Sequence, residues 1–128
     1  MPYGQQTLWP DHCIQGKSGA EFHPWLDWTK AELVLRKGFR KAIDSYSAFF
    51  ENDRKTPTGL AGYLGERGIG AITLVGLATD YCVAFSALDA VRRGLETTVR
   101  LDCCRAIDLG DSLEQMLGKM REAGVRLV

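Results

Sequence analysis

The sequence predicts an α/β protein built on a parallel sheet. From residue 57 onward, segments with helical spacing alternate with short apolar segments, in the order helix, strand, helix, strand, helix, strand. Regular alternation of this kind is typical of right-handed crossovers that place helices on the faces of a parallel sheet. With 128 residues and 45% hydrophobic content, we expect residues 1–128 to form a single domain with a real core.

Charge and composition exclude several classes of partner. The 16 basic and 16 acidic residues are dispersed without a run of one sign, which gives no footprint for nucleic acid or an anionic membrane. No apolar run approaches the roughly 20 residues that cross a bilayer, and the first residues lack the features of a signal peptide. We therefore expect a cytoplasmic protein whose four cysteines are reduced.

The first half of the chain contains few regular elements. Residues 1–28 are predicted to form a loop, because proline and glycine recur too densely for a helix or strand. Residues 32–36 are a short strand candidate that places Lys37 at a strand's carboxyl end. Ligands gather at that end in open α/β sheets, so Lys37 is a candidate site residue, with a solvated loop charge as the alternative. Residues 39–55 are expected to be irregular or to form one short helical turn.

The second half contains the predicted sheet and helices. Thr56 can cap the first helix and Pro57 fits its first position. Each predicted helix ends at a glycine: residues 57–67 before Gly68, residues 80–93 before Gly94, and a helix to residue 123 before Gly124. The predicted strands are residues 71–76, residues 97–101 and residues 125–128.

Residues 72–83 form the segment with the clearest chemistry. They are expected to form a buried strand, a tight glycine-containing turn and a helix whose first turn carries Cys82. A helix N-terminus carries roughly half a positive charge, which favours the thiolate form of a nearby cysteine. A free cysteine is more often buried and inert. Among the four cysteines, the position of Cys82 at a helix start makes it the candidate reactive thiol.

The sequence GLATDYCV at residues 76–83, with SALDA at residues 86–90 behind it, resembles the nucleophile motif of nicotinamidases, within the isochorismatase-like cysteine hydrolases. Further blocks similar to that family follow its order and cover nearly the whole chain: WPDHCIQG at 9–16, GAEFHP at 19–24, KG at 37–38, YSAF at 46–49 and DCCRAID at 102–108. The resemblance implies a three-layer, Rossmann-like parallel sheet with helices on both faces.

The resemblance implies a nucleophilic Cys82 and a supporting catalytic Lys37. In such enzymes the thiolate attacks the carboxamide carbon of nicotinamide, ammonia leaves, and water hydrolyses the thioester to nicotinate. The backbone N–H groups of Ala78 and Cys82 are expected to form the oxyanion hole, typically worth a few kcal/mol per donor. The family also implies a cis peptide bond between Leu77 and Ala78.

The resemblance further implies substrate and metal contacts. Trp9 and Tyr46 match residues that flank the substrate ring, although plain core aromatics are the alternative from the sequence alone. Leu77 and Tyr81 are also expected at the substrate, and Tyr81 replaces a histidine of some relatives. His12 matches a ligand of a divalent metal (zinc, iron or manganese) that holds the pyridine nitrogen, but one histidine is not a site.

The family's catalytic aspartate, its other metal ligands and its first two strands precede the block at residues 9–16. We therefore expect an amino-terminally truncated domain that lacks these two strands, has an incomplete metal site and shows weak or no turnover. The two strands would occupy a gap of about 10 Å between residues 32–36 and residues 71–76. We therefore expect either that another chain fills this gap, as in a homo-oligomer, or that the edge of the sheet stays exposed. Two alternatives stay open: a related hydrolase of another substrate, and a non-catalytic fragment that pairs with another chain.

Overall fold

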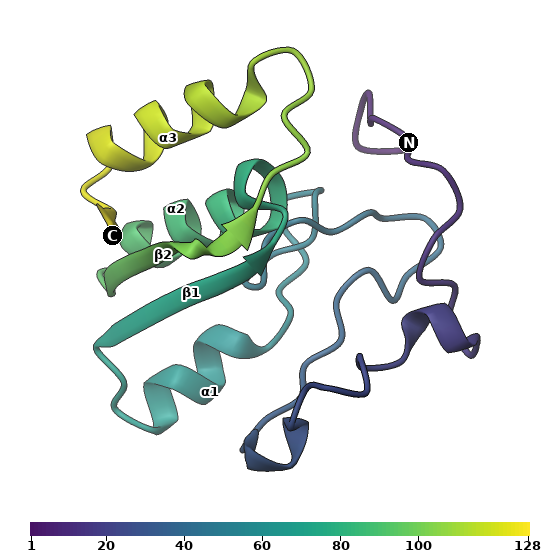
Figure 1. Cartoon of the computed structure of the whole chain (residues 1–128), viewed down its shortest axis with the longest axis horizontal. Helices are drawn as coiled ribbons and strands as arrows, with labels where there is room; N and C mark the ends of the chain where they lie inside the picture. Colours follow the sequence, from purple (N-terminus) through teal and green to yellow (C-terminus); the bar gives the residue numbers. More distant parts are fainter.

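The computed structural model describes residues 1–128, and its regular elements lie mainly in the second half of the chain (Figure 1). The helices and strands alternate along the chain: α1 (Leu60–Glu66), β1 (Ala71–Leu77), α2 (Ala84–Arg92), β2 (Glu96–Arg105), α3 (Ser112–Glu122) and β3 (Arg126–Leu127). A π-helical turn, Thr79–Val83, leads into α2. The predicted α/β alternation is therefore confirmed.

The three strands form one parallel sheet in the order β1–β2–β3. Both crossovers run in the same direction across the sheet, and right-handed crossovers then place their helices on the same face. Figure 1 shows α2 and α3 side by side. No helix of the structure is long and apolar enough to cross a membrane.

The main core lies between the sheet and this pair of helices. Its buried members come from β2, α2, α3 and the segments beside them: Val83, Ala84, Ala87, Val99, Cys104, Met116, Met120 and Val125. Leu74 of β1 packs against this cluster. A second buried cluster joins Phe49, Leu64 of α1 and Ala90 of α2, with Ile72 of β1 packed against it. Since Ile72 and Leu74 point to the same side of β1, α1 lies on the same face as α2.

The opposite face of β1 is uncovered. Val75 and Leu77 alternate with the core-facing residues and are 56% and 71% exposed. Within residues 1–128 the three helices therefore lie on one face of the sheet. The reason is topological: all crossovers of this chain deliver their helices to one face.

Two expected elements differ in the structure. Residues 32–36 form no strand, and Leu33 and Val34 are 40% and 43% exposed. No strand lies beside them, and a segment without a partner cannot satisfy its backbone groups in a sheet. Helix α1 begins at Leu60 rather than at Pro57, because Pro57 forms an isolated antiparallel bridge with Phe50.

The cap of α1 also differs from the expected one. Gly59 occupies the N-cap position instead of Thr56, and Thr58, which precedes it, accepts a hydrogen bond at its Oγ1 from the backbone N–H of Leu60, at 3.2 Å. Two further boundaries shift: the segment after β1 starts as a π-helical turn at Thr79, and β2 continues to Arg105. The loop at residues 1–28 and the irregular structure of residues 39–55 are as predicted, apart from two short 3-10 turns, Ser18–Ala20 and Trp28–Lys30.

We predict that Met120→Ala lowers the free energy of unfolding by about 2–5 kcal/mol, because Met120 is fully buried and its truncation leaves a cavity. The neighbouring exposed change Lys119→Ala serves as the control and should stay within about 0.5 kcal/mol of the unchanged protein. Urea denaturation measures both. Equal losses in the two variants would contradict the assignment of this core.

Candidate active site

The turn after β1 presents the candidate nucleophile. Gly76 has φ +114°, which favours glycine, and the peptide bond between Leu77 and Ala78 is cis, as expected. Ala78 is extended, and the π-helical turn then begins at Thr79 and carries Cys82. The Cys82 side chain is half-buried at the start of the helical segment. The predicted strand–turn–helix arrangement around this thiol is therefore present.

Lys37 reaches this thiol from a segment without regular structure. Its Nζ donates hydrogen bonds to Cys82 Sγ at 3.3 Å and to the carbonyl oxygen of Ser45 at 2.7 Å. An ammonium group beside a sulfur atom favours the thiolate. The structure thus brings together two predicted site residues that lie 45 positions apart.

Three aromatic side chains meet next to Cys82. The rings of Trp9 and Tyr81 lie 5.0 Å apart between centroids, at 86°, and those of Tyr46 and Tyr81 lie 5.5 Å apart, at 71°. Trp9 Nε1 also donates to Tyr46 Oη at 3.1 Å. Edge-to-face geometry of this kind is favourable for aromatic rings. Because Tyr81 directly precedes Cys82, this aromatic cluster borders the nucleophile turn.

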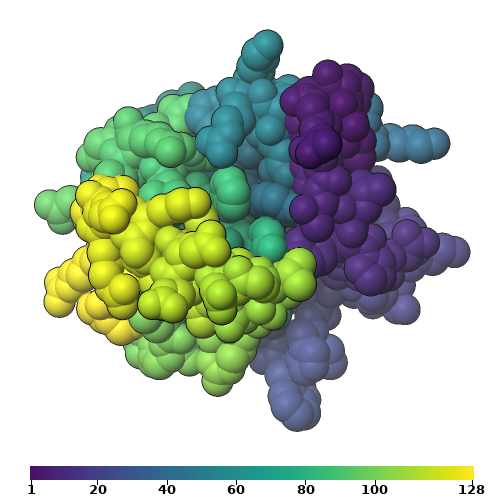
Figure 2. Space-filling model, turned by 90° about the horizontal axis from the view of Figure 1, so that it is seen from above, coloured from purple at the N-terminus to yellow at the C-terminus, as the bar shows by residue number.

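The aromatic cluster is assembled from distant segments. Figure 2 shows the amino-terminal segment (purple), which carries Trp9, on one side of the molecule and the carboxyl-terminal part, with α3 (yellow-green), on the other.

Burial, reinforced by the nearby Asp44 carboxylate, raises the pKa of Tyr46 although Trp9 and Gln6 donate to its oxygen. Tyr46 is therefore a neutral phenol at pH 7.

Gln6 is a member of this site that the sequence does not indicate. Its side-chain amide donates to Tyr46 Oη at 2.8 Å and to Asp44 Oδ2 at 3.1 Å, and its carbonyl oxygen accepts from Asn52 Nδ2 at 3.0 Å. Gln6 thereby ties the amino-terminal segment to the loop that carries Tyr46. Its partners lie 38 to 46 positions away, so no local pattern could have identified it.

Asp80 is a structural carboxylate and not a free base. It is almost fully buried and accepts hydrogen bonds from the N–H groups of Ile107 and Asp108, at 3.1 and 2.7 Å, and from Ser112 Oγ at 2.6 Å. Burial acts to raise the pKa of Asp80, but these hydrogen bonds outweigh it and hold the pKa below its ordinary value. Asp102, another carboxylate of the motif blocks, pairs with Arg100 at 2.6 Å on the surface.

His12 and Leu77 lie outside this set of contacts. The Nδ1 atom of His12 lies 2.7 Å from the carbonyl oxygen of Pro10, which can only accept, so Nδ1 carries a proton and donates this hydrogen bond. However, no group of three or more His, Cys, Asp or Glu side chains in this chain could hold a metal ion. Leu77 projects from the uncovered face of β1. The residues of this chain alone do not fit a metal site.

Comparisons with known proteins agree with the motif blocks. The model of the isochorismatase domain matches residues 1–128. A nicotinamidase of Acinetobacter baylyi is 54% identical over 128 residues, which are 100% of this chain and 60% of that protein. The chain therefore spans about three fifths of the length of this relative.

Solved structures show the same fold. The chain matches a nicotinamidase and pyrazinamidase of Acinetobacter baumanii with a TM-score of 0.96 and 55% identity, covering 100% of this chain and 62% of that one. A pyrazinamidase of Pyrococcus horikoshii in complex with zinc matches with a TM-score of 0.79 and 30% identity, covering 94% of this chain and 63% of that one.

We predict that acid weakens the fold through Asp80. Because its pKa is lowered in the folded state, its contribution to stability is fully present above the ordinary aspartate value and is lost as the pH falls below about 4. Asp80→Asn should cost about 1.5–3 kcal/mol at neutral pH, since charge-assisted hydrogen bonds to a buried group are lost. The variant should also flatten the decline of stability between about pH 5 and pH 3.

Urea denaturation across this pH range measures both effects. The matched control is Asp102→Asn, which removes a carboxylate that is exposed and paired only with Arg100. An exposed pair contributes little to stability, so this variant should unfold like the unchanged protein. An acid decline that is the same with and without Asp80 would refute the role given to this carboxylate.

Proposed function

We propose that this chain, which belongs to the isochorismatase family, carries the nucleophile of a nicotinamidase-type amidohydrolase. The observation that carries the proposal is the 3.3 Å contact between Lys37 Nζ and Cys82 Sγ beside the rings of Trp9, Tyr46 and Tyr81. A thiol held against a cation at the start of a helical segment is the arrangement that covalent amide hydrolysis requires. Relatives that match along the chain are nicotinamidases, which supports nicotinamide as the substrate.

The proposed reaction has two steps. The Cys82 thiolate attacks the carboxamide carbon and a C–S bond forms; the C–N bond then breaks, and the nitrogen takes a proton from water and leaves as ammonia, so that a hydroxide ion remains. The hydroxide attacks the thioester carbon, the C–S bond breaks, and Cys82 leaves as the thiolate while the nicotinic acid product gives its proton to ammonia and becomes nicotinate. During both steps the carbonyl oxygen carries negative charge, and we assign its stabilisation to the backbone N–H groups of Ala78 and Cys82.

We assign the substrate ring to the aromatic cluster of Trp9, Tyr46 and Tyr81, whereas Leu77 projects from the uncovered face of β1. Aromatic faces and edges close to the thiol suit a flat heteroaromatic ring. In this proposal Lys37 has a separate task, because its Nζ donates a hydrogen bond to the Cys82 sulfur while the Ser45 carbonyl holds the lysine in place.

His12 is the one metal ligand that the family resemblance assigns to this chain. A divalent ion such as zinc, iron or manganese would polarise and anchor the pyridine nitrogen in a complete site, and the zinc complex of the Pyrococcus horikoshii pyrazinamidase supports a metal in the family. Imidazole suits these ions. Since one imidazole is not a site, and no carboxylate contacts the thiol, we expect weak turnover from residues 1–128 alone.

A second candidate is a unit that pairs with another chain, including a second copy of itself. The specific observation is the uncovered face of β1, where Val75 and Leu77 are exposed, together with the outer edge of β1, which no strand pairs. An unpaired edge strand next to exposed apolar side chains favours association. This candidate does not require the chemistry of Cys82.

We predict that nicotinaldehyde, the aldehyde analogue of nicotinamide, protects Cys82 from iodoacetamide. The thiolate adds to the aldehyde carbon as it would to the amide carbon, and the aromatic cluster holds the ring. Tryptic residues 68–92 contain Cys82 as their single cysteine, so mass spectrometry follows this thiol alone. Cyclohexanecarbaldehyde is the control, and equal protection by both aldehydes would refute recognition of the ring.

The same samples test turnover. Ammonia release from nicotinamide by the purified chain should be small and should disappear in Cys82→Ser, because the hydroxyl is a far weaker nucleophile. Robust release that disappears in Cys82→Ser would support the proposed reaction and overturn the expected weakness of this chain. Ammonia release that persists in Cys82→Ser would contradict the assignment of Cys82 as the nucleophile.

We predict that the chain associates in solution and that Val75→Lys weakens this association, because the change places a charge on the uncovered face of β1. Gln115→Lys on the exposed side of α3 adds the same charge elsewhere and should leave the association unchanged. Size-exclusion chromatography with light scattering gives the mass of each variant. A clean monomer with fully cooperative thermal unfolding would count against pairing.

A further inference from the structure

We infer that Ser86 is a positioning residue for Cys82: its hydroxyl fastens the loop that holds Lys37 to the helix that carries the thiol. This inference deepens the proposed function and rests on it for its catalytic meaning. It assigns a role to a side chain that contacts no substrate, at the third position of α2.

The geometry around Ser86 connects two distant segments. Its Oγ donates to the carbonyl oxygen of Cys82 at 2.6 Å and accepts from the backbone N–H of Ala48 at 2.8 Å. Ala48 lies 38 positions away, in the loop between Tyr46 and Phe49. Ser86 is only 5% exposed, so water does not replace either partner easily.

A common feature of helices could account for half of this arrangement. Serine in a helix often donates to the carbonyl four residues earlier, and this bond alone has no functional meaning. The bond from the Ala48 N–H distinguishes Ser86 from this common feature, because it connects the helix to a distant loop. Here one oxygen atom satisfies a loop N–H and the carbonyl of the nucleophile at the same time.

Four hydrogen bonds and the chain segments between them form a closed path that begins and ends at Cys82. From the Cys82 carbonyl the path passes through Ser86 to Ala48, and three residues earlier the carbonyl of Ser45 accepts from Lys37 Nζ. The same Nζ donates to Cys82 Sγ. If Ser86 releases the loop, Ser45 shifts and takes Lys37 with it.

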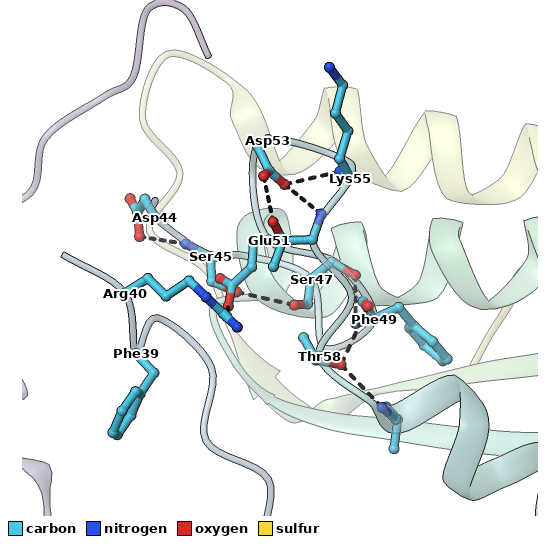
Figure 3. Close-up of polar contacts among 12 residues, drawn as sticks. Phe39, Arg40, Asp44, Ser45, Ser47, Phe49, Glu51, Asp53, Lys55 and Thr58 are labelled. Atoms are coloured by element: carbon cyan, nitrogen blue, oxygen red, sulfur yellow. Dashed lines mark hydrogen bonds and ion pairs between the residues drawn. The ribbon is translucent and has the colours of Figure 1, made fainter. Parts of the chain in front are cut away.

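This transmission requires a loop that moves as one piece, and its internal contacts provide that. Figure 3 shows the loop cross-linked by a contact from Ser45 Oγ to the backbone carbonyl of Ser47 and by one from Thr58 Oγ1 to the backbone carbonyl of Phe49. Arg40 of the Lys37 segment also pairs with the buried Glu51 at 3.3 Å. A shift at Ala48 is therefore passed to Ser45 instead of being absorbed between them.

The test compares three changes at two serines. Ser86→Ala removes the hydroxyl and leaves the Ala48 N–H without an acceptor, whereas Ser86→Thr keeps a hydroxyl at the same place. Ser47→Ala is the matched control, because Ser47 is also buried and its Oγ also accepts a loop N–H, from Phe49 at 3.1 Å, but it does not bond to the helix.

The measurement is the rate of iodoacetamide labelling of Cys82 in the full chain. We expect Ser86→Ala to slow this rate on the order of threefold to tenfold, as for other coupled contacts, because Lys37 no longer supports the thiolate. Ser86→Thr should restore the rate, Ser47→Ala should leave it unchanged, and Ser86→Ala should add nothing in a Lys37→Ala background.

Cys104 supplies the control for unfolding, because it is 4% exposed in the main core. Fragment ions distinguish it from Cys103, and it should stay unlabelled in every variant. An unchanged Cys82 rate in Ser86→Ala, a parallel gain of Cys104 labelling, or equal slowing by Ser47→Ala would each overturn the inference. Labelling needs no amide hydrolysis, so the role of Ser86 and the amidase proposal can fail separately.

Discussion

The contact between the Lys37 ammonium and the Cys82 sulfur is the constraint on which the site depends. Cys82 stands in the π-helical turn that follows β1, where the backbone is fixed, and Lys37 belongs to a segment with no helix or strand. Such a segment keeps its shape only through polar contacts. Those contacts are present: Lys37 is held by Ser45, and the N–H of Asn52 donates to the Asp44 carbonyl at 2.8 Å.

The fold supplies two kinds of support for this contact. The sheet, α2 and α3 enclose one apolar cluster, which fixes the nucleophile turn from below. The second cluster, around Phe49 and Leu64, fixes the loop from the side of α1. Ala90 of α2 belongs to the second cluster while Ala87 belongs to the first, so a single helix carries both clusters and sets the distance between them.

Local patterns predicted the parts of the molecule whose structure is local. Gly68, Gly94 and Gly124 follow the three helices at positive φ, and the turn from β1 to Cys82 follows its sequence. Patterns failed where the outcome depends on a distant partner. Residues 32–36 have the composition of a strand but no neighbour to pair with. Thr56 is a good cap residue, but Pro57 bridges to Phe50, so α1 begins later and Gly59 takes the cap position. Gln6 and Ser86 act through residues almost forty or more positions away, which no spacing reveals.

The hydrogen bonds of the buried Asp80 carboxylate determine how long a chain must be to hold the nucleophile turn at residues 76–83. Its three donors all come from the segment between β2 and the first residue of α3. A shorter chain ending after β2 would keep every residue of the thiol motif, yet the Asp80 carboxylate would lose all three of these donors, and with them the contacts that fix the start of the nucleophile turn. The smallest unit that can carry this nucleophile turn therefore extends to Ser112, well past the last residue that has a chemical role.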